Sequence, residues 1–108
     1  MRAWDIEDRR DRIVVRFGVH VSAEDGKESA RRFLELMGER YVHLVLDLRE
    51  TRGYESDARK AWQSAVWPVR QRITRLTVAS RFAVPRMGAS MFAAFLGIPC
   101  EIVDELPG

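Results

Sequence analysis

The feature that most constrains the fold is the segment from Tyr41 to Leu48, which is apolar at every position except His43 and Asp47. A run that is apolar on both of its alternating faces is typical of a strand in the middle of a sheet, with other strands on both edges. We therefore predict that this segment is the central strand and that helices cover it on at least one side. The strand ends on the acidic Asp47, and a short polar loop follows.

The first forty residues predict a hairpin and a helix. Apolar residues recur at every second position from Ile13 to Val21, and a shorter alternating stretch from Ala3 to Asp8 precedes them. The two stretches predict an opening pair of strands. A helix is predicted over residues 23–37, because Ser22 is a suitable N-cap and Gly38 a suitable C-terminal stop.

The rest of the chain alternates helices and strands. Apolar residues at helical spacing predict a second helix, in which Pro68 either introduces a kink or begins a separate short piece after Val66. A strand over 76–80, a third helix from Pro85 to Leu96 and a last strand over 100–103 follow. The predicted order is β-β-α-β-α-β-α-β, which is an α/β fold with a mixed sheet.

Length and composition fit one soluble domain that spans residues 1–108. Hydrophobic residues make up 46% of the chain and charged residues 31%, and no apolar run approaches the roughly 20 residues of a membrane span. The single cysteine and a charged start without the apolar core of a signal peptide favour the cytoplasm. The net charge of +2 is spread along the chain, so we expect no nucleic-acid partner and no membrane insertion.

One short motif carries a resemblance to a known family. The central strand ends in Leu46-Asp47-Leu48, and Glu55-Ser56-Asp57-Ala58 stands at the expected start of the second helix. This motif, with the order of elements, resembles the STAS domain of bacterial anti-sigma factor antagonists and sulfate transporters. The opening hairpin is similar to that of small bacterial proteins related in fold to CRAL-TRIO domains. The resemblance implies a STAS-like mixed sheet with helices mainly on one face.

The resemblance also implies a bacterial regulatory module that docks a partner protein near this motif. In family members that switch partners, a kinase phosphorylates a serine of the motif, and the added charge releases the partner. Ser56 matches the first serine of the family's pair, but Asp57 occupies the second position and Ala58 replaces a glycine. Asp57 therefore either holds the domain in a phosphate-like state or leaves it without regulation by phosphorylation, and we expect no phosphate on Ser56. The expected partner-binding residues are Asp47, Thr51, Glu55, Ser56, Asp57 and Trp67.

Several of these residues also have a structural interpretation. Ser56 fits the N-cap of the second helix, where its hydroxyl would accept a hydrogen bond from a free backbone amide. Asp47 either contacts a partner or forms a structural hydrogen bond in its loop. Trp67 either projects outward as an anchor for a partner or is turned into the core by Pro68.

The third helix is apolar almost all the way round, which leaves two alternatives. It is buried against the sheet, or it presents a surface to a partner or ligand. We expect Met87, Met91 and Phe95 to line an apolar-ligand pocket between sheet and helix or to form a homodimer face. The predicted order lacks the helix that closes the family fold, and this favours a homodimer through the third helix or the Trp67 face.

No group of residues predicts catalysis, a metal or a cofactor. The chain has two histidines and one cysteine, in no spacing that suits zinc or a catalytic pair, and no glycine-rich phosphate loop follows a strand. We expect His43 to be satisfied structurally and Cys100 to be buried and inert. The sequence thus favours a non-enzymatic interaction module, with a binder of a small apolar ligand or lipid as first alternative and a small enzyme as second.

Overall fold

The computed structural model of the protein describes residues 3–106. The strands are β1 (Trp4–Asp8), β2 (Arg12–Phe17), β3 (His20–Val21), β4 (Val42–Leu48), β5 (Gly53–Tyr54), β6 (Ile73–Ser80) and β7 (Cys100–Val103). The helices are α1 (Ala23–Met37), α2 (Ser56–Val66), the 3-10 helix η1 (Trp67–Arg72) and α3 (Ala83–Leu96).

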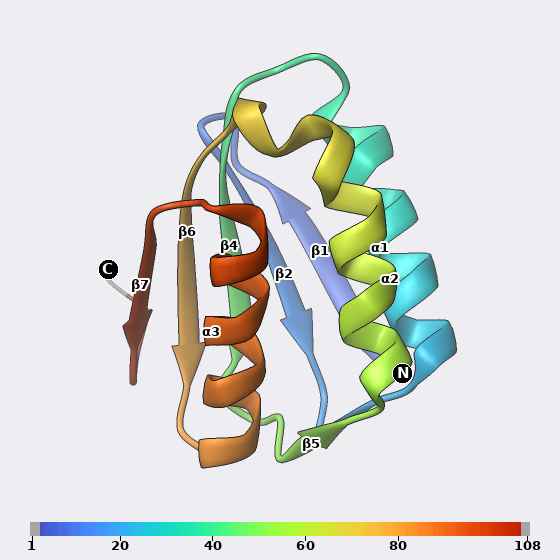
Figure 1. The fold of residues 1–108 in the computed structure, drawn as a ribbon, viewed down its shortest axis with the longest axis vertical. Coiled ribbons are helices and arrows are strands. Elements are labelled where there is room, and N and C mark those ends of the chain that lie inside the picture. Colours follow the sequence, from blue (N-terminus) through green and yellow to red (C-terminus); the bar gives the residue numbers. More distant parts are fainter. Residues whose placement is uncertain (1–2, 107–108) are drawn as a thin grey trace.

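The strands and helices build a mixed sheet with the helices packed against one face (Figure 1). The main sheet has the order β1-β2-β4-β6-β7, in which β1 is antiparallel to β2 and the other pairs are parallel. A second, small sheet pairs β3 with β5. The predicted fold class is confirmed, and β4 is central as expected. Leu44 faces the helix side and is fully buried, while Val45 on the other face is only 3% exposed.

The predicted strand from residue 13 to residue 21 is wrong at its end. β2 stops at Phe17, and β3 leaves the main sheet to pair with β5. The backbone carbonyl of Val19 accepts a hydrogen bond from the Arg52 N–H at 2.8 Å, and that of Val21 accepts one from the Glu55 N–H at 2.9 Å. These partners draw the chain out of the sheet and fasten it to the loop that follows β4.

The first helix has the predicted bounds and packs closely on the second. Ser22 and Asp25 form a capping box, in which each side chain accepts a hydrogen bond from the other residue's backbone N–H. A Cβ atom on Gly26 would lie 2.6 Å from the Cα of Ala58, so only glycine allows this approach of α1 to α2.

The second helix divides near Pro68, as one of the two alternatives predicted. α2 ends at Val66 and η1 follows, because proline has no N–H to continue the hydrogen-bond ladder. Trp67 is 43% exposed, so it lies neither in the core nor free in solvent. Its ring contacts the Phe95 ring at a centroid distance of 5.2 Å, and the Arg70 guanidinium lies 3.7 Å above it.

His43 and Cys100 differ in how well the sequence predicted them. His43 Nε2 lies 2.7 Å from Thr77 Oγ1, and burial followed by the charge of Arg75 lowers its pKa, so the ring is neutral at pH 7. The expected burial of Cys100 is wrong: it begins the edge strand β7, and its side chain is exposed. Partial desolvation and the Glu101 charge raise the pKa of the thiol, which is therefore protonated at neutral pH.

Candidate protein-docking site

The candidate site lies at one edge of the sheet, where the parallel strands end. β2, β4, β6 and β7 run in the same direction, so their carboxyl ends meet at the lower edge in Figure 1. The loop from β4 to β5 and the turn from β6 to α3 lie at this edge. In open α/β sheets, functional groups gather at such an edge because the connecting loops converge there.

Asp47 is the buried centre of this edge, with only 2% of its surface exposed. One carboxylate oxygen accepts from Arg16 Nε at 2.9 Å and Arg49 Nη2 at 2.8 Å, and the other from Arg49 Nε at 2.9 Å. Burial raises the pKa of Asp47, but the hydrogen bonds from Arg49 and Arg16 outweigh this effect and hold it at about 2. The ionised carboxylate therefore fixes two arginines and is itself shielded from any partner.

Thr51 and Arg52 fasten the loop that follows. Thr51 is 1% exposed, and its hydroxyl donates to the Gly18 carbonyl at 2.8 Å. The Arg52 guanidinium lies 4.8 Å from the ring centroid of Phe82, which precedes α3. The loop is thus attached to the turn after β2 on one side and to the start of α3 on the other. Thr51, like Asp47, is buried and holds the loop in place through its hydrogen bonds.

Glu55, Ser56 and Asp57 are exposed together at the start of α2. The prediction that Ser56 is the N-cap is wrong: Glu55 is the N-cap, and no side chain caps the helix. The Glu55 carboxylate instead accepts from the Ala23 N–H at 3.2 Å, which joins the starts of α1 and α2. Ser56 is therefore the first helical residue, and Asp57 follows in the first turn, where the helix dipole favours a negative charge.

Trp67 does not join these residues. It lies at the other end of α2, beside the end of α3 (Figure 1), and it belongs to a different surface. We call this surface the apolar stripe. The stripe consists of Trp67 (43% exposed), Val84 (55%), Met87 (65%), Met91 (50%) and Phe95 (51%).

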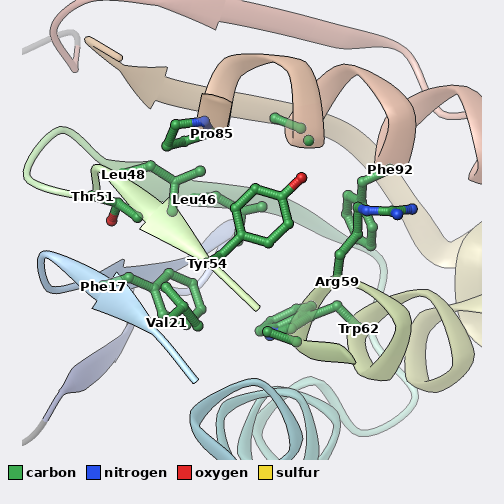
Figure 2. A pocket seen from close by; sticks show the side chains of 13 residues that line it. Phe17, Val21, Leu46, Leu48, Thr51, Tyr54, Arg59, Trp62, Pro85 and Phe92 are labelled. Atoms are coloured by element: carbon green, nitrogen blue, oxygen red, sulfur yellow. The ribbon is translucent and has the colours of Figure 1, made fainter. Parts of the chain in front are cut away.

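Met87, Met91 and Phe95 do not line the apolar pocket beside α3, in contrast to the expected ligand pocket, and the alternative of a homodimer face stays a prediction. The side chains point outward, while the opposite side of α3 covers a pocket of about 80 Å³. Figure 2 shows the Tyr54 ring in the middle of this pocket. The lining residues are Phe17, Val21, Leu46, Leu48, Thr51, Tyr54, Ala58, Arg59, Trp62, Pro85, Gly88, Ala89 and Phe92.

Tyr54 needs a glycine opposite it. A Cβ atom on Gly88 would lie 2.3 Å from the Tyr54 hydroxyl oxygen. In this arrangement α3 therefore passes Tyr54 at a residue that has no Cβ atom. Arg59 at the rim has a buried Nε atom without a hydrogen-bond partner in the described part of the chain. No motif marked these residues, because a tyrosine, a glycine and an arginine on separate elements give no pattern in the sequence.

The arginines of the carboxyl edge were also missed, although a signal for them exists. Arg49 directly follows the apolar strand β4, and Arg81 directly follows β6. Two cations that end neighbouring parallel strands must lie at the same edge of the sheet.

No helix within residues 3–106 is long and apolar enough to span a membrane. In the same range, no three His, Cys, Asp or Glu side chains are grouped as metal ligands.

Comparison with known proteins supports the fold. The sequence matches no protein-family model, and no curated protein is similar to it. The structure is similar to the crystal structure of an uncharacterized DUF3478-family protein with a SpoIIAA-like fold from Shewanella loihica PV-4. The TM-score is 0.72 at 11% sequence identity, and the match covers 95% of this chain and 86% of that one. At this identity the likeness shows the fold alone. The protein has a SpoIIAA-like fold, that of the STAS domain, as the motif around Asp47 predicted.

Proposed function

We propose that the protein is a non-enzymatic regulatory module of the bacterial cytoplasm that docks a partner protein through the start of α2. The observation that carries the proposal is the joint exposure of Glu55, Ser56 and Asp57 at a helix start that is fastened to the start of α1. The SpoIIAA-like fold supports a regulatory role in general terms. Asp47 and Thr51 do not contact the partner but support the docking site, since their buried hydrogen bonds fix the loop before α2.

This helix start suits a partner that brings a cation or a hydrogen-bond acceptor. Glu55 and Asp57 supply negative charge, and the first backbone N–H groups of α2 have no side-chain cap. A loop that is already fixed loses little conformational freedom on binding, which favours affinity. Asp57 stands where the family carries its second serine, so we expect docking at this site that is not switched by phosphorylation of Ser56. Mass spectrometry of the protein from its own host should find Ser56 unmodified, and a phosphate there would contradict this part of the proposal.

The experiment that tests docking begins with capture of the partner from a lysate of the source organism and its identification. The purified partner is then titrated against the wild-type protein and the Asp57→Arg variant. We expect at least about a tenfold loss of affinity, because the exposed charge is reversed at the contact. Glu39→Arg is the control, since it makes the same change in charge on an exposed residue before β4, at the opposite edge of the sheet. Unchanged affinity of Asp57→Arg would reject the docking site.

Binding of a small apolar ligand is the second candidate function, favoured by the buried Nε of Arg59 beside the apolar pocket. Ligand pockets usually enclose roughly 300–1,000 Å³, so Tyr54 would have to turn outward to make room. Decanoate is a suitable probe, because it combines an alkyl chain for the pocket with a carboxylate for Arg59. Saturable binding that is lost in Arg59→Gln would favour this function, and no binding would leave docking as the better account.

A further inference from the structure

The residues that follow three neighbouring strands carry charges of opposite sign. Arg49 follows β4 and Arg81 precedes α3 after β6, whereas Asp104 and Glu105 follow β7. One Glu105 oxygen accepts from Arg49 Nη1 at 3.1 Å, and the other accepts from Arg81 Nη2. A single carboxylate is therefore held between two arginines that come from different strands of the sheet.

Arg49 and the neighbouring Arg86 are each held by a contact that involves neither Glu105 nor Asp104. Arg49 is bound to the buried Asp47 through Nε and Nη2, which leaves Nη1 for Glu105. Arg86 donates from Nη1 to the Ser80 carbonyl at 2.8 Å and to Asp104 at 3.0 Å. Their guanidinium groups keep these anchors when the acidic residues move away. A cation that is already oriented loses little side-chain freedom when it binds a new carboxylate.

The local charge depends on the segment after β7. Four arginines meet three acidic residues in this network, which consists of Arg16, Arg49, Arg81, Arg86, Asp47, Asp104 and Glu105. The network has a net charge of +1 while all three acidic residues are in place. The net charge rises to +3 when Asp104 and Glu105 move away from the arginines. The side chains of these two are 82% and 59% exposed. Exposed ion pairs contribute little to stability, so both acids can be displaced easily.

We propose that Arg49 and Arg81 form a docking site for a carboxylate in an acidic segment of a partner protein. Glu105 occupies this site until the partner displaces it. The inference rests on the proposed function, because it names the chemistry of the partner for the same edge of the sheet. The loop after β4 runs between this site and the start of α2 (Figure 1), so one partner can reach both.

The tethered Glu105 sets a requirement on the partner. A side chain held beside its site by a few residues competes at an effective concentration on the order of millimolar. A lone carboxylate in solution cannot displace it at lower concentrations, whereas a segment with several carboxylates can engage Arg86 as well. The partner segment should therefore carry at least two acidic residues close together.

The test uses a fluorescein-labelled hexaglutamate peptide and fluorescence anisotropy at low ionic strength. Glu105→Gln removes the competitor and should tighten binding about fivefold. Arg81→Gln removes half of the site and should weaken binding about tenfold. Neither residue is buried, so both variants should fold, and a thermal melt of each checks this.

The ion pair of Arg75 and Glu101 supplies matched controls. Its two side chains are both 53% exposed and join the neighbouring strands β6 and β7. Arg75→Gln and Glu101→Gln change the net charge as the test variants do, but away from the proposed site, and should alter binding less than twofold. Equal effects of Arg75→Gln and Arg81→Gln, or no gain in Glu105→Gln, would overturn the proposal. A single-stranded DNA of equal charge that binds as tightly as the peptide would also overturn it.

This experiment is independent of the partner titration. The peptide probes only the arginines, whereas Asp57→Arg probes only the start of α2. A gain in Glu105→Gln combined with unchanged partner affinity in Asp57→Arg would keep this site and reject the proposed docking surface. The reverse combination would keep the docking surface and reject this site.

Discussion

The carboxyl edge of the sheet and the apolar stripe are both exposed, but the charged side chains of the edge have partners within the chain, whereas the apolar side chains of the stripe are left in contact with water. At the edge, Arg49 and Arg81 bind acidic groups of the same chain, and the buried Asp47 lies beneath them. On the stripe, Met87 and Met91 expose half or more of their surface to water. Charged side chains on a surface can pair with one another within one molecule. Exposed apolar side chains are removed from water only when another apolar surface covers them.

The difference predicts two kinds of contact. Contacts at the edge should be electrostatic, should weaken with salt, and must displace existing partners. Contacts through the stripe should depend on buried apolar area and change little with salt. The two surfaces can therefore be disrupted separately, and variants that affect one should leave the other unchanged.

The largest expected effect separates the two sides of α3. Phe92 is 3% exposed and its ring meets that of Trp62, whereas Phe95 is 51% exposed on the apolar stripe. Phe92→Ala should lower the free energy of unfolding by about 3–5 kcal/mol, because it leaves a cavity in the core. Phe95→Ala should lower it by no more than about 1 kcal/mol. Urea denaturation measures both, and equal losses would mean that the stripe is part of the core.

The next effect concerns the ionic centre of the edge. The pKa of Asp47 is about 2 in the folded protein against 3.8 ordinarily, so its ionised form stabilises the fold above pH 4. Asp47→Asn should lower the free energy of unfolding by about 2 kcal/mol at pH 7. That difference should shrink as the pH falls from 4 and vanish below the folded pKa of about 2, where the wild-type carboxyl is also neutral.

An exposed ion pair provides the comparison for this variant. Asp11 lies 3.6 Å from Arg12 Nε, and its side chain is 76% exposed. Asp11→Asn should change stability by less than about 0.5 kcal/mol at pH 7. A loss in Asp11→Asn as large as that in Asp47→Asn would show that general charge, and not the buried carboxylate, stabilises the edge.

The same two regions show what the sequence can predict. Periodicity located α2, because a helix that is apolar along one side has one choice of inner face. The proline at position 68 located the break that follows. α3 is apolar almost all round, so the sequence could not tell that Phe92 faces the core and Phe95 the solvent. The outcome depends on Gly88, which lets α3 approach Tyr54, and such a contact between distant residues leaves no local pattern.

At the edge, the sequence located the loop but not the state of each side chain. The motif indicated a strand that ends in Leu46-Asp47-Leu48 and a helix that begins near Ser56, and the structure has β4 ending at Leu48 and α2 beginning at Ser56. The buried Asp47 is hydrogen-bonded to Arg16, which lies 31 positions earlier on the neighbouring strand. Register between strands is a tertiary property, so the exposed and the supporting residues of the site could not be separated in advance.

The smallest expected effect is weak self-association through the apolar stripe. The five side chains of the stripe expose on the order of 500 Å², less than the roughly 800 Å² per partner of a standard interface. The five side chains of the stripe carry no charge, and the one cation stacked on them, Arg70 over Trp67, lies at the end of the stripe, so two copies related by a two-fold axis can meet through Met87, Met91 and Phe95. We expect a homodimer that forms at micromolar concentrations and resists added salt. Sedimentation velocity should show it for the wild-type protein and only a monomer for Met91→Glu. Glu105→Gln, which alters only the edge, should remain dimeric, and a wild-type monomer at every concentration would show that the stripe serves no second copy.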